Sequence, residues 1–380
     1  LGLGESDAFF IHPDAKAYFE ARRKELDERY DTWQKTFQAW KKANPQLAER
    51  WESARKPGKE QIAAVSMPDF ATGESVATRK ASGKVLNAIA DAMPSMIGGS
   101  ADLAGSNVTA MPQHGIFGPD NPSGRTINFG VREHGMAAVT NGLALYEGFR
   151  TFCATFLVFS DYLRPSARLA ALMGLPVIYV LTHDSIFIGE DGPTHQPIEH
   201  NAAMRAIPNM DLLRPGDAQE TAEAWAMAME RDDGPSVIVL TRQNLRIYEK
   251  ADPDWKENAR RGAYVVKDCD GEPEVVLAAT GSEVNLALEA AASSSKKVRV
   301  VSVLSLNRFR GQDREFRHGL LPPSARIITV EAGVSDGWEG IASDEDHAFA
   351  LNRFGASGPG NEVAEHLGFT ASALTRLVDG

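Results

Sequence analysis

A regular alternation of strand-like and helix-like segments between residues 70 and 250 most strongly constrains the fold of this chain. Such alternation predicts a mostly parallel sheet with helices on both faces. Residues 177–180 and 237–240 are apolar on both faces, which suits strands buried in such a sheet. The expected strands are 95–99, 125–130, 150–156, 176–183, 210–214 and 236–241, and the expected helices are 76–92, 133–146, 162–173 and 218–230.

The pattern divides the chain into three expected parts. Residues 1–65 include apolar residues at helical spacing over 14–42 and a shorter helix over 46–55, so they are expected to form a helical linker or arm. Residues 66–250 form the first α/β domain. Residues 251–272 are charged and are expected to be an irregular boundary. The second α/β domain, 251–380, has expected strands 275–279, 298–304 and 327–330 and helices 283–292, 361–367 and 371–378. The predicted fold class is therefore α/β, with two parallel-sheet, three-layer domains.

Composition and the absence of certain motifs argue against several classes of function. The formal net charge of −11 argues against nucleic acid as the main partner, although a small phosphorylated ligand needs only two or three local cations. Two cysteines provide neither a disulfide framework nor metal-ligand spacing, and they favour a reducing, cytoplasmic setting. No apolar run has the length of a membrane span. The P-loop, the zinc-protease motif and the serine-hydrolase elbow are absent from the sequence.

Candidate chemistry gathers where the expected strands end. The stretch 182–197 follows a strand and contains two histidines, three acids and two glycines. Residues 98–103, 130–134 and 241–244 follow three other strands, so a parallel sheet would bring all four segments to one edge. Judged from position alone, these residues also fit simpler structural interpretations. The 182–197 stretch also fits a solvated turn, Glu133 fits a partner for its helix dipole, and Arg242 fits a surface ion pair.

Several motifs resemble the transketolase family, in that family's order and near its spacing. The resemblance covers nearly the whole chain, and the combination is specific. The motifs are Ala77-Thr-Arg-Lys-Ala-Ser82, Gly98-Gly-Ser-Ala-Asp-Leu-Ala104, Phe129-Gly-Val-Arg-Glu-His134, Phe156-Leu-Val-Phe-Ser-Asp-Tyr162, Thr182-His-Asp-Ser185, Gly189-Glu-Asp-Gly-Pro-Thr-His-Gln-Pro197, Thr241-Arg-Gln-Asn-Leu245, Val330-Glu-Ala-Gly-Val334 and Gly337-Trp338.

The resemblance implies a thiamine-diphosphate-dependent transferase of the pentose phosphate pathway. Such an enzyme moves a two-carbon ketol unit from a ketose phosphate of the xylulose 5-phosphate type to an aldose phosphate of the ribose 5-phosphate type. The cofactor lies between the pyrimidine-binding domain of one subunit and the pyrophosphate-binding domain of the other, which implies a homodimer. On this resemblance, residues 66–250 are the pyrimidine-binding domain and 251–380 the C-terminal domain.

The resemblance also implies which residues contact the cofactor. Glu133 matches the glutamate that hydrogen-bonds the pyrimidine ring, and burial is expected to raise its pKa. An aromatic wall for the pyrimidine is expected from Phe156, Phe159 and Tyr162. Residues near the centre of the cofactor are expected to be Asp102 and Leu103. The ligands for a Mg²⁺ or Ca²⁺ ion are expected in the pyrophosphate-binding domain.

The expected substrate contacts divide into two groups. A phosphate group is expected to bind Arg79, Ser106, His183 and Arg242, because arginine forks and a hydroxyl suit a dianion. The sugar hydroxyls and the reacting carbonyl are expected to contact Asp191 and His195, and His195 can carry a proton near neutral pH.

The match also has limits. The chain begins after the position of the family's pyrophosphate-binding domain, as either one subunit of a split enzyme or part of a larger chain would. Without that domain in cis or in trans, we expect no turnover and weak or no binding of thiamine diphosphate. Gly105 and His134 depart from residues common in the family, and neither change is expected to affect the chemistry. The C-terminal domain shows no catalytic pattern and is expected to serve dimer packing.

Two other functions fit parts of the sequence. One is a related enzyme of the same architecture, deoxyxylulose-phosphate synthase or dihydroxyacetone synthase. The sequence contexts of His183, Asp191 and Arg242 favour transketolase over these. The other is a non-catalytic dimerising or regulatory module. An intact Glu133 and an intact 189–197 stretch argue against it, although a shared fold alone does not fix function.

Overall fold

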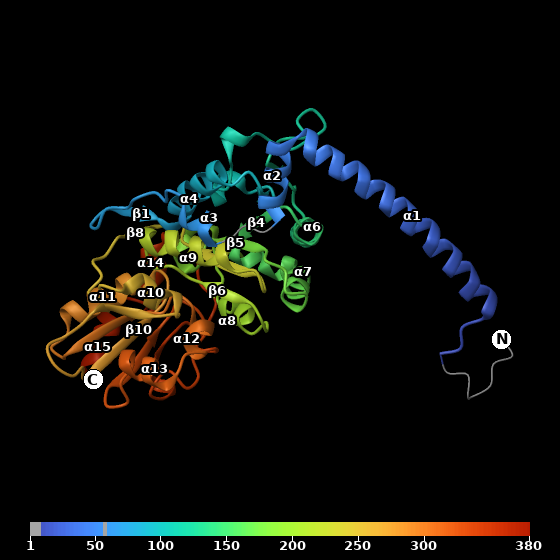
Figure 1. Ribbon diagram of the computed structural model, residues 1–380. Helices are drawn as coiled ribbons and strands as arrows, with labels where there is room; N and C mark the ends of the chain where they lie inside the picture. Colours follow the sequence, from blue (N-terminus) through green and yellow to red (C-terminus); the bar gives the residue numbers. More distant parts are fainter. Residues whose placement is uncertain (1–8, 56–58) are drawn as a thin grey trace. The chain divides into compact units, whose positions relative to one another are not determined.

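The computed structural model describes residues 9–55 and 59–380, which belong to two compact units, Leu1–Lys56 and Pro57–Gly380. In the first unit, the long helix α1 (Pro13–Ala43) and the shorter α2 (Pro45–Arg55) confirm the two helices expected there (Figure 1). Pro45 separates them because it cannot continue α1 without breaking its hydrogen bonding. The break expected at residues 56–59 lies largely outside the described residues.

Aromatic side chains along one face of α1 form a stripe that packs within this unit. Phe37 stacks on Trp33 and Trp40, with ring centroids 5.2 and 5.8 Å away, and lies edge-on to Trp51 of α2 at 5.0 Å. No described side chain of α1 is fully buried in this unit. The stripe therefore holds the α1–α2 pair together while leaving much of its surface exposed.

The second unit begins with a six-stranded sheet in which every strand is parallel to its neighbours. Its order is β3-β2-β4-β5-β7-β6. All six expected strands are confirmed. Their bounds are β2 (Met96–Ser100), β3 (Thr126–Asn128), β4 (Arg150–Phe156), β5 (Ile178–Thr182), β6 (Asp211–Leu213) and β7 (Ser236–Leu240).

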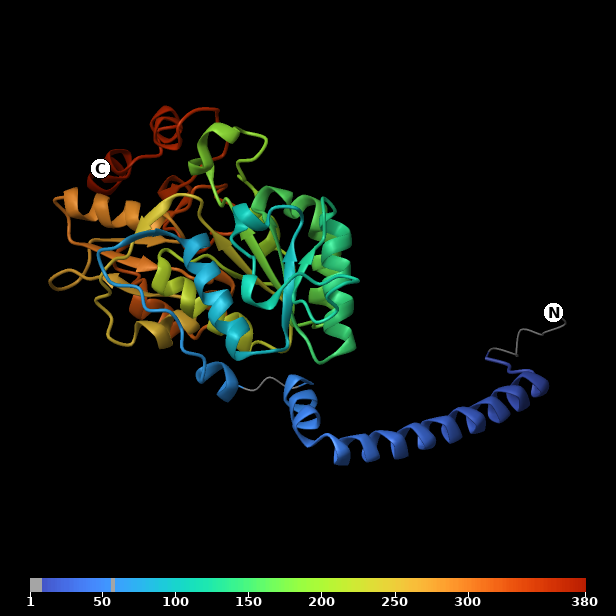
Figure 2. The same ribbon diagram turned by 90° about the horizontal axis from the view of Figure 1, so that it is seen from above.

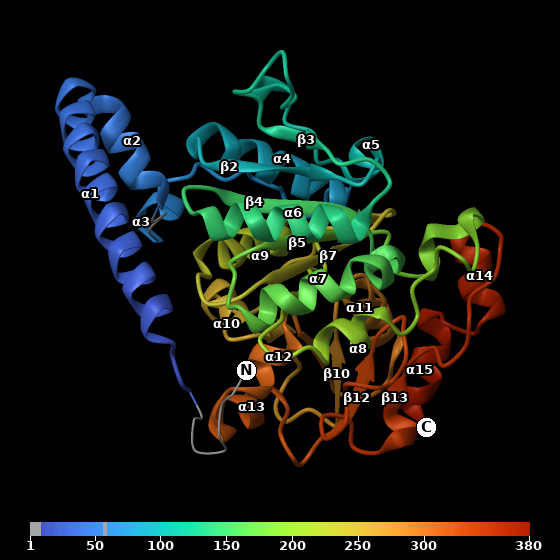
Figure 3. The same cartoon turned by 90° about the vertical axis from the view of Figure 1, so that its right-hand side faces the viewer.

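Helices cover both faces of this sheet, as expected (Figure 3). On one face, α4 (Thr78–Ala92) and α9 (Ala218–Glu230) bury an apolar cluster around Trp225. On the other, α6 (Glu133–Tyr146) and α7 (Ser160–Leu172) bury a second cluster that includes Tyr179. The core strands are apolar on both faces because both faces are covered.

The second sheet has the order β13-β12-β10-β11-β9 and is not wholly parallel. Its edge strand β9 runs antiparallel to β11, so the expectation that residues 251–272 are irregular was wrong. A helix and this strand lie there. The strand is only four residues long, too short for a clear alternation of apolar residues. The elements are α10 (Trp255–Arg260), β9 (Tyr264–Lys267), β10 (Val275–Ala279), β11 (Val298–Ser302), β12 (Arg326–Val330) and β13 (Ala348–Phe349).

Helices also cover both faces of the second sheet. One face packs against α11 (Glu283–Ser293) and α15 (Ala371–Asp379), and the other against α12 (Leu306–Arg310) and α13 (Arg314–Leu320). The apolar cluster under α11 is continuous with the one under α4 and α9, so the two sheets share one core. Within the described residues, no helix is both long enough and apolar enough to cross a membrane.

A small two-stranded sheet positions two segments of the candidate site. Here β1 (Ser75–Ala77) pairs antiparallel with β8 (Asn244–Arg246), so the helix expected from residue 76 starts two residues later. The pairing brings the hydroxyls of Thr78 and Thr241 to 3.1 Å from each other. The next residues along the chain are Arg79 and Arg242, so the side chains of these two arginines extend from neighbouring points of the backbone.

The remaining elements of the second unit are short. They are α3 (Lys59–Ala63), α5 (Ala104–Asn107), α8 (His200–Arg205), α14 (Gly360–His366) and the 3-10 helices η1 (Pro112–His114), η2 (Leu157–Phe159), η3 (Ile186–Asp191) and η4 (Glu345–His347).

Candidate active site

The four segments expected to converge do lie along one edge of the six-stranded sheet. They follow β2, β3, β5 and β7, and the parallel pairing of these strands puts their carboxyl ends on the same side. In α/β sheets this edge is where ligands bind. In Figure 3, α5 and the segment next to α14 both lie at this end of the sheet.

Three aromatic rings form a continuous wall at this edge. Phe156, the last residue of β4, stacks on Phe159 with ring centroids 5.8 Å apart and an interplanar angle of 4°. Phe159 in turn contacts Tyr162 at 6.1 Å. Phe156 is buried, Phe159 is half-buried and Tyr162 is 64% exposed, so the wall leads from the core to the surface. Such a wall presents flat apolar faces on which a heterocycle can stack.

His183 lies against the buried end of this wall. Its ring stacks on Phe156 with centroids 3.7 Å apart, and its backbone takes a left-handed conformation with φ of 63°. Its Nδ1 atom is 2.7 Å from the Thr182 hydroxyl. Burial, together with the nearby positive charges of Arg79 and Arg242, lowers the pKa of His183 to about 3. The imidazole is therefore neutral at physiological pH.

His195 also contacts this wall. Its ring stands edge-on to Phe159, with centroids 5.5 Å apart, and edge-on to Phe156 at 6.4 Å. Its Nδ1 atom contacts the hydroxyl of Thr194 at 2.9 Å. The structure thus brings two histidines that are twelve residues apart in the sequence against the same phenyl ring, that of Phe156.

Arg79 and Arg242 form a cationic pair at this site. Arg79 is half-buried and donates to the carbonyl oxygen of Ser106, while its Nε atom is buried without a hydrogen-bond partner. Burial and the charge of Arg242 lower the pKa of Arg79. Within the described residues, neither arginine forms a salt bridge with a carboxylate. Two neighbouring guanidinium groups without an anion favour binding of one from solution.

Within the described residues, four of the predicted site residues make no hydrogen bond, ion pair or ring contact with this cluster. Glu133 starts α6 and is half-buried, and its carboxyl makes no hydrogen bond within the described part of the chain. Asp191 ends η3 and is exposed. Asp102 is exposed with φ of 62°, and Leu103 is half-buried at the start of α5. The dry surroundings expected for Glu133 are therefore not complete within this chain.

The 182–197 segment is held by the second sheet's domain rather than left as a free turn. The buried side chain of Gln196 donates to the carbonyl oxygens of Gly189 and Ala356, at 3.0 and 2.9 Å. A Cβ atom on Gly355 would lie 1.7 Å from Oε1 of Gln196. Figure 2 shows the segment, in yellow-green, beside the red C-terminal helices. The C-terminal domain thus supports the segment that carries Asp191 and His195.

Two residues of the site could not be identified from the sequence. Asn107 and Thr182 are fully buried and hydrogen-bonded to each other at 2.7 Å, next to His183. Polar residues beside site residues are common in any sequence, so the place of Thr182 in a motif was a weak signal, and Asn107 lies in none of the motifs. Only the packing of α5 against the end of β5 brings Asn107 to the Thr182 hydroxyl beside the imidazole.

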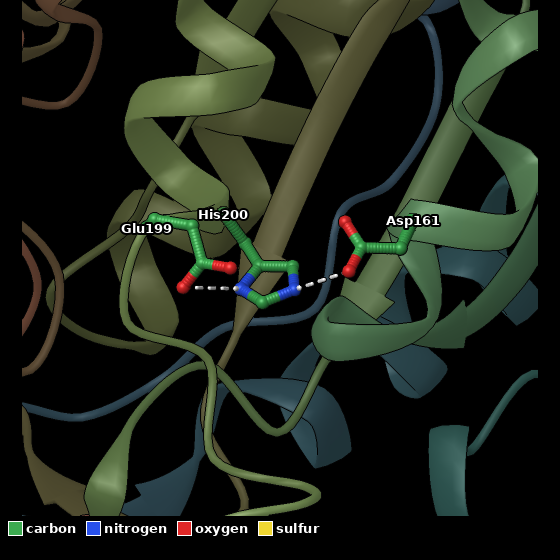
Figure 4. A group of neighbouring side chains, drawn as sticks. All are labelled: Asp161, Glu199 and His200. Atoms are coloured by element: carbon green, nitrogen blue, oxygen red, sulfur yellow. Dashed lines mark ion pairs between the residues drawn. The ribbon is translucent and has the colours of Figure 1, made fainter. Parts of the chain in front are cut away.

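A separate cluster joins α7 to α8 (Figure 4). Buried His200 lies between two exposed carboxylates, with Nε2 3.3 Å from Asp161 and Nδ1 3.7 Å from Glu199. It is the one group of acids and histidines in the described residues whose spacing could suit a metal ion. Each carboxylate faces a different nitrogen of the ring, so the histidine lies between two acids from two helices.

Comparisons with known proteins agree on one family. Residues 74–247 match the family described as "Transketolase, pyrimidine binding domain", and residues 262–370 match "Transketolase-like TK C-terminal domain". Transketolase of Treponema pallidum is 47% identical over 382 residues, which is all of this chain and 58% of that protein. Transketolase of Geobacillus stearothermophilus is 45% identical over 377 residues, 98% of this chain and 56% of that protein.

Solved structures give the same result. Transketolase from Leishmania mexicana has a TM-score of 0.89 at 36% identity, over 96% of this chain and 54% of that chain. The Pichia stipitis transketolase in complex with sedoheptulose 7-phosphate has a TM-score of 0.90 at 35% identity, over 99% and 56%. A split-gene transketolase in an inactive beta4 tetramer has a TM-score of 0.63 at 26% identity, over 80% of this chain and 97% of that chain. The chain thus spans little more than half the length of the full-length relatives.

Proposed function

Because this chain belongs to the transketolase family, with that family's pyrimidine-binding and C-terminal domains, we propose that it forms one side of a thiamine-diphosphate-dependent ketol-transfer site. The donor would be a ketose phosphate of the xylulose 5-phosphate type and the acceptor an aldose phosphate of the ribose 5-phosphate type, as in the pentose phosphate pathway. One observation carries the proposal. Arg79 and Arg242, which form no salt bridge within the described residues, lie beside two histidines that contact a stacked aromatic wall.

The cofactor side would use the wall and Glu133. The parallel rings of Phe156 and Phe159 leave flat apolar surface for the pyrimidine, with Tyr162 at the exposed end. Glu133, whose carboxyl makes no hydrogen bond within the described residues, would hydrogen-bond a ring nitrogen of the pyrimidine and exchange a proton with it. Asp102 and Leu103 would lie near the centre of the cofactor. When bound, thiamine diphosphate supplies the stabilised carbanion for the transfer, and Mg²⁺ or Ca²⁺ would be held by the pyrophosphate-binding domain.

The substrate side would begin at the cations. Arg79 and Arg242 would hold the phosphate group of the sugar, with the hydroxyl of Ser106 and the imidazole of His183 as further contacts. Asp191 and His195, from the segment supported by the C-terminal domain, would hold sugar hydroxyls and the reacting carbonyl. Edge-on packing against Phe159 would orient His195 to exchange a proton there.

A second copy of the chain would complete the site. Large apolar residues of α6 and α7 are exposed, including Tyr146 at 78% and Leu172 at 73%. Apolar surface of this kind favours a protein interface, and we propose that it is the homodimer interface. A pyrophosphate-binding domain, supplied in cis or in trans, would cover Glu133.

We propose that residues 1–65 are the linker, residues 66–250 the pyrimidine-binding domain and residues 251–380 the C-terminal domain. Because neither cysteine forms a disulfide, we also propose a reducing, cytoplasmic compartment.

The test measures ketol transfer from xylulose 5-phosphate to ribose 5-phosphate, with thiamine diphosphate and Mg²⁺. The chain alone should be inactive and should bind the cofactor weakly in calorimetry. Addition of a purified pyrophosphate-binding domain from a close relative should restore activity. Glu133→Gln, which keeps size and removes charge, should abolish the restored activity. Tight cofactor binding by the chain alone, or equal activity with E133Q, would contradict the proposal.

A further inference from the structure

A chain of buried hydrogen bonds runs from β2 to His183. The Asn107 amide nitrogen donates to the Ser100 hydroxyl at 3.2 Å, and its amide oxygen accepts from the Thr182 hydroxyl at 2.7 Å. The Thr182 oxygen also lies 2.7 Å from Nδ1 of His183. Ser100, Asn107, Thr182 and His183 are all at most 3% exposed, so water does not compete for these bonds. In each of these hydrogen bonds, the chemistry of the two groups determines which one donates the hydrogen.

Proton counting fixes the tautomer of His183. A threonine hydroxyl has one hydrogen, and here it is donated to the amide oxygen of Asn107, which can only accept. The contact between Thr182 and Nδ1 therefore needs a hydrogen on the ring nitrogen. A neutral imidazole with a proton on Nδ1 has a lone pair on Nε2. Within the described residues, Nε2 makes no hydrogen bond, so it is the atom left to contact a ligand.

We propose that Asn107 and Thr182 hold His183 as the Nδ1–H tautomer, so that an oxyanion binding between Arg79 and Arg242 is accompanied by uptake of one proton at Nε2. The inference rests on the proposed phosphate site and adds that Asn107 and Thr182 are positioning residues for it. An oxyanion accepts hydrogen bonds and cannot donate to a lone pair. His183 can therefore contact it only after Nε2 is protonated.

The charges around His183 explain why the proton arrives with the anion. Arg79 from α4, Arg242 after β7 and His195 all disfavour a positive charge on its ring. Within the described residues, no carboxylate pairs with it, since the carboxylate of adjacent Asp184 is bound to Arg214 at 2.7 Å. A dianion placed between the arginines reverses this balance, because an opposite charge at close range favours the charged form of imidazole. Binding of the anion and protonation of His183 should therefore occur together.

The first experiment uses the chain as it is, with sulfate as the probe. Sulfate remains a dianion between pH 5 and 8, so the ligand itself takes up no proton. Long-range ¹⁵N–¹H spectra distinguish the two neutral tautomers from the imidazolium, and His183→Gln identifies the His183 signals. We expect Nδ1–H alone without sulfate and both nitrogens protonated with sulfate. A wild-type chain with the proton on Nε2 in the absence of anion would overturn the proposal.

The second experiment counts protons by calorimetry at pH 5, above the pKa of about 3 that His183 has without an anion, in two buffers of different ionisation enthalpy. The anion should raise the pKa of His183 past this pH, so the wild-type chain should take up close to one proton per bound sulfate. His183→Gln should bind sulfate with no uptake. Binding with no proton uptake by the wild type would overturn the coupling and leave the phosphate site intact. Failure to bind sulfate at all would overturn the phosphate site of the proposed function, and proton uptake with it.

Two variants test the positioning residues. Thr182→Val has nearly the same shape but no hydroxyl, so His183 should lose its fixed tautomer and show mainly Nε2–H without sulfate. Proton uptake on sulfate binding should then fall below half a proton. Thr182→Ser keeps the hydroxyl and should restore both the tautomer and the uptake. If Thr182→Val does not fold, Asn107→Asp tests the same point, since its carboxylate still accepts from Thr182 and should preserve the Nδ1–H tautomer. A changed tautomer in the serine or aspartate variant would contradict the proposal.

Discussion

The imidazole of His183 stacks on the phenyl ring of Phe156, with ring centroids 3.7 Å apart and an interplanar angle of 25°. Phe156 belongs to the wall proposed for the cofactor, and His183 to the group proposed for the substrate phosphate. The two halves of the proposed site therefore share a contact. A change at either residue should affect the other.

Phe156→Ala tests this contact through stability and anion binding. Loss of a buried phenyl ring should lower the free energy of unfolding by about 3–5 kcal/mol. It should also weaken sulfate binding, because His183 loses the ring that orients it. Urea denaturation and calorimetry measure the two effects. The control is Tyr162→Ala, whose exposed ring should change stability by no more than about 0.5 kcal/mol. A stable Phe156→Ala chain with normal sulfate binding would contradict the expectation.

Arg242→Gln should change both the charge and the anion affinity of the site. The positive charge of Arg242 is one of the causes that lower the pKa of His183, so its removal should raise that pKa. Loss of one charge-assisted hydrogen bond should weaken sulfate binding roughly 10-fold, which corresponds to about 1.4 kcal/mol. An NMR titration of His183 and calorimetry measure these effects. Arg246→Gln, an exposed neighbour in β8, should leave both unchanged. An unaltered His183 titration in Arg242→Gln would refute the electrostatic argument.

Stability should depend on pH through His183. Its pKa is about 3 in the folded chain and near the ordinary value of 6.5 when unfolded, so the unfolded chain binds the proton more readily. The contribution of neutral His183 is fully present above pH 6.5 and is lost as pH falls toward 3. The urea midpoint of His183→Gln should therefore fall less steeply over this range than that of the wild type. His366→Gln, at an exposed position, should follow the wild-type curve. Parallel curves for His183→Gln and wild type would contradict the assignment.

Arg214→Met should strongly destabilise the contact between the two sheets. Arg214 is fully buried and pairs with Asp184 at 2.7 Å, with Glu283, and with Glu331 at 3.7 Å. Removing the cation leaves buried carboxylates uncompensated, at an expected cost of about 3–5 kcal/mol. Lys296→Met removes one partner of a solvent-exposed pair and should cause no measurable change. Urea denaturation of both variants measures the difference, and equal stabilities would refute it.

Gly355→Ala should displace the 182–197 segment. The added methyl group would overlap Oε1 of Gln196, so Gln196 would lose its bonds to Gly189 and Ala356. The expected results are a less stable chain and altered NMR signals of His195, while His366 signals stay unchanged. Gly319→Ala, in α13, has open space at the same atom and should have neither effect. Unchanged His195 signals in Gly355→Ala would show that the C-terminal domain does not position this segment.

Local periodicity was sufficient for most of the fold. The buried strands and long amphipathic helices have strong repeats, so all six strands of the first sheet and the helices α4, α6, α7 and α9 were predicted near their true bounds. The antiparallel strand β9 and the helix α10 were not. Both are short, and their stability comes from packing against β11 and the shared core rather than from a pattern in their own residues.

The sequence by itself determined the class of fold, the family resemblance and, to within two residues, where each expected strand ends. It placed Glu133 at a helix start and His183 at the end of a strand. Only the tertiary structure decided that Thr182 bonds Asn107, 75 residues away, that His183 lies on Phe156, and that Gln196 is held by residues 160 positions later. Such contacts depend on the order in which strands pair and on how the two sheets pack. These are properties of the whole chain, whereas periodicity reports only on neighbouring residues.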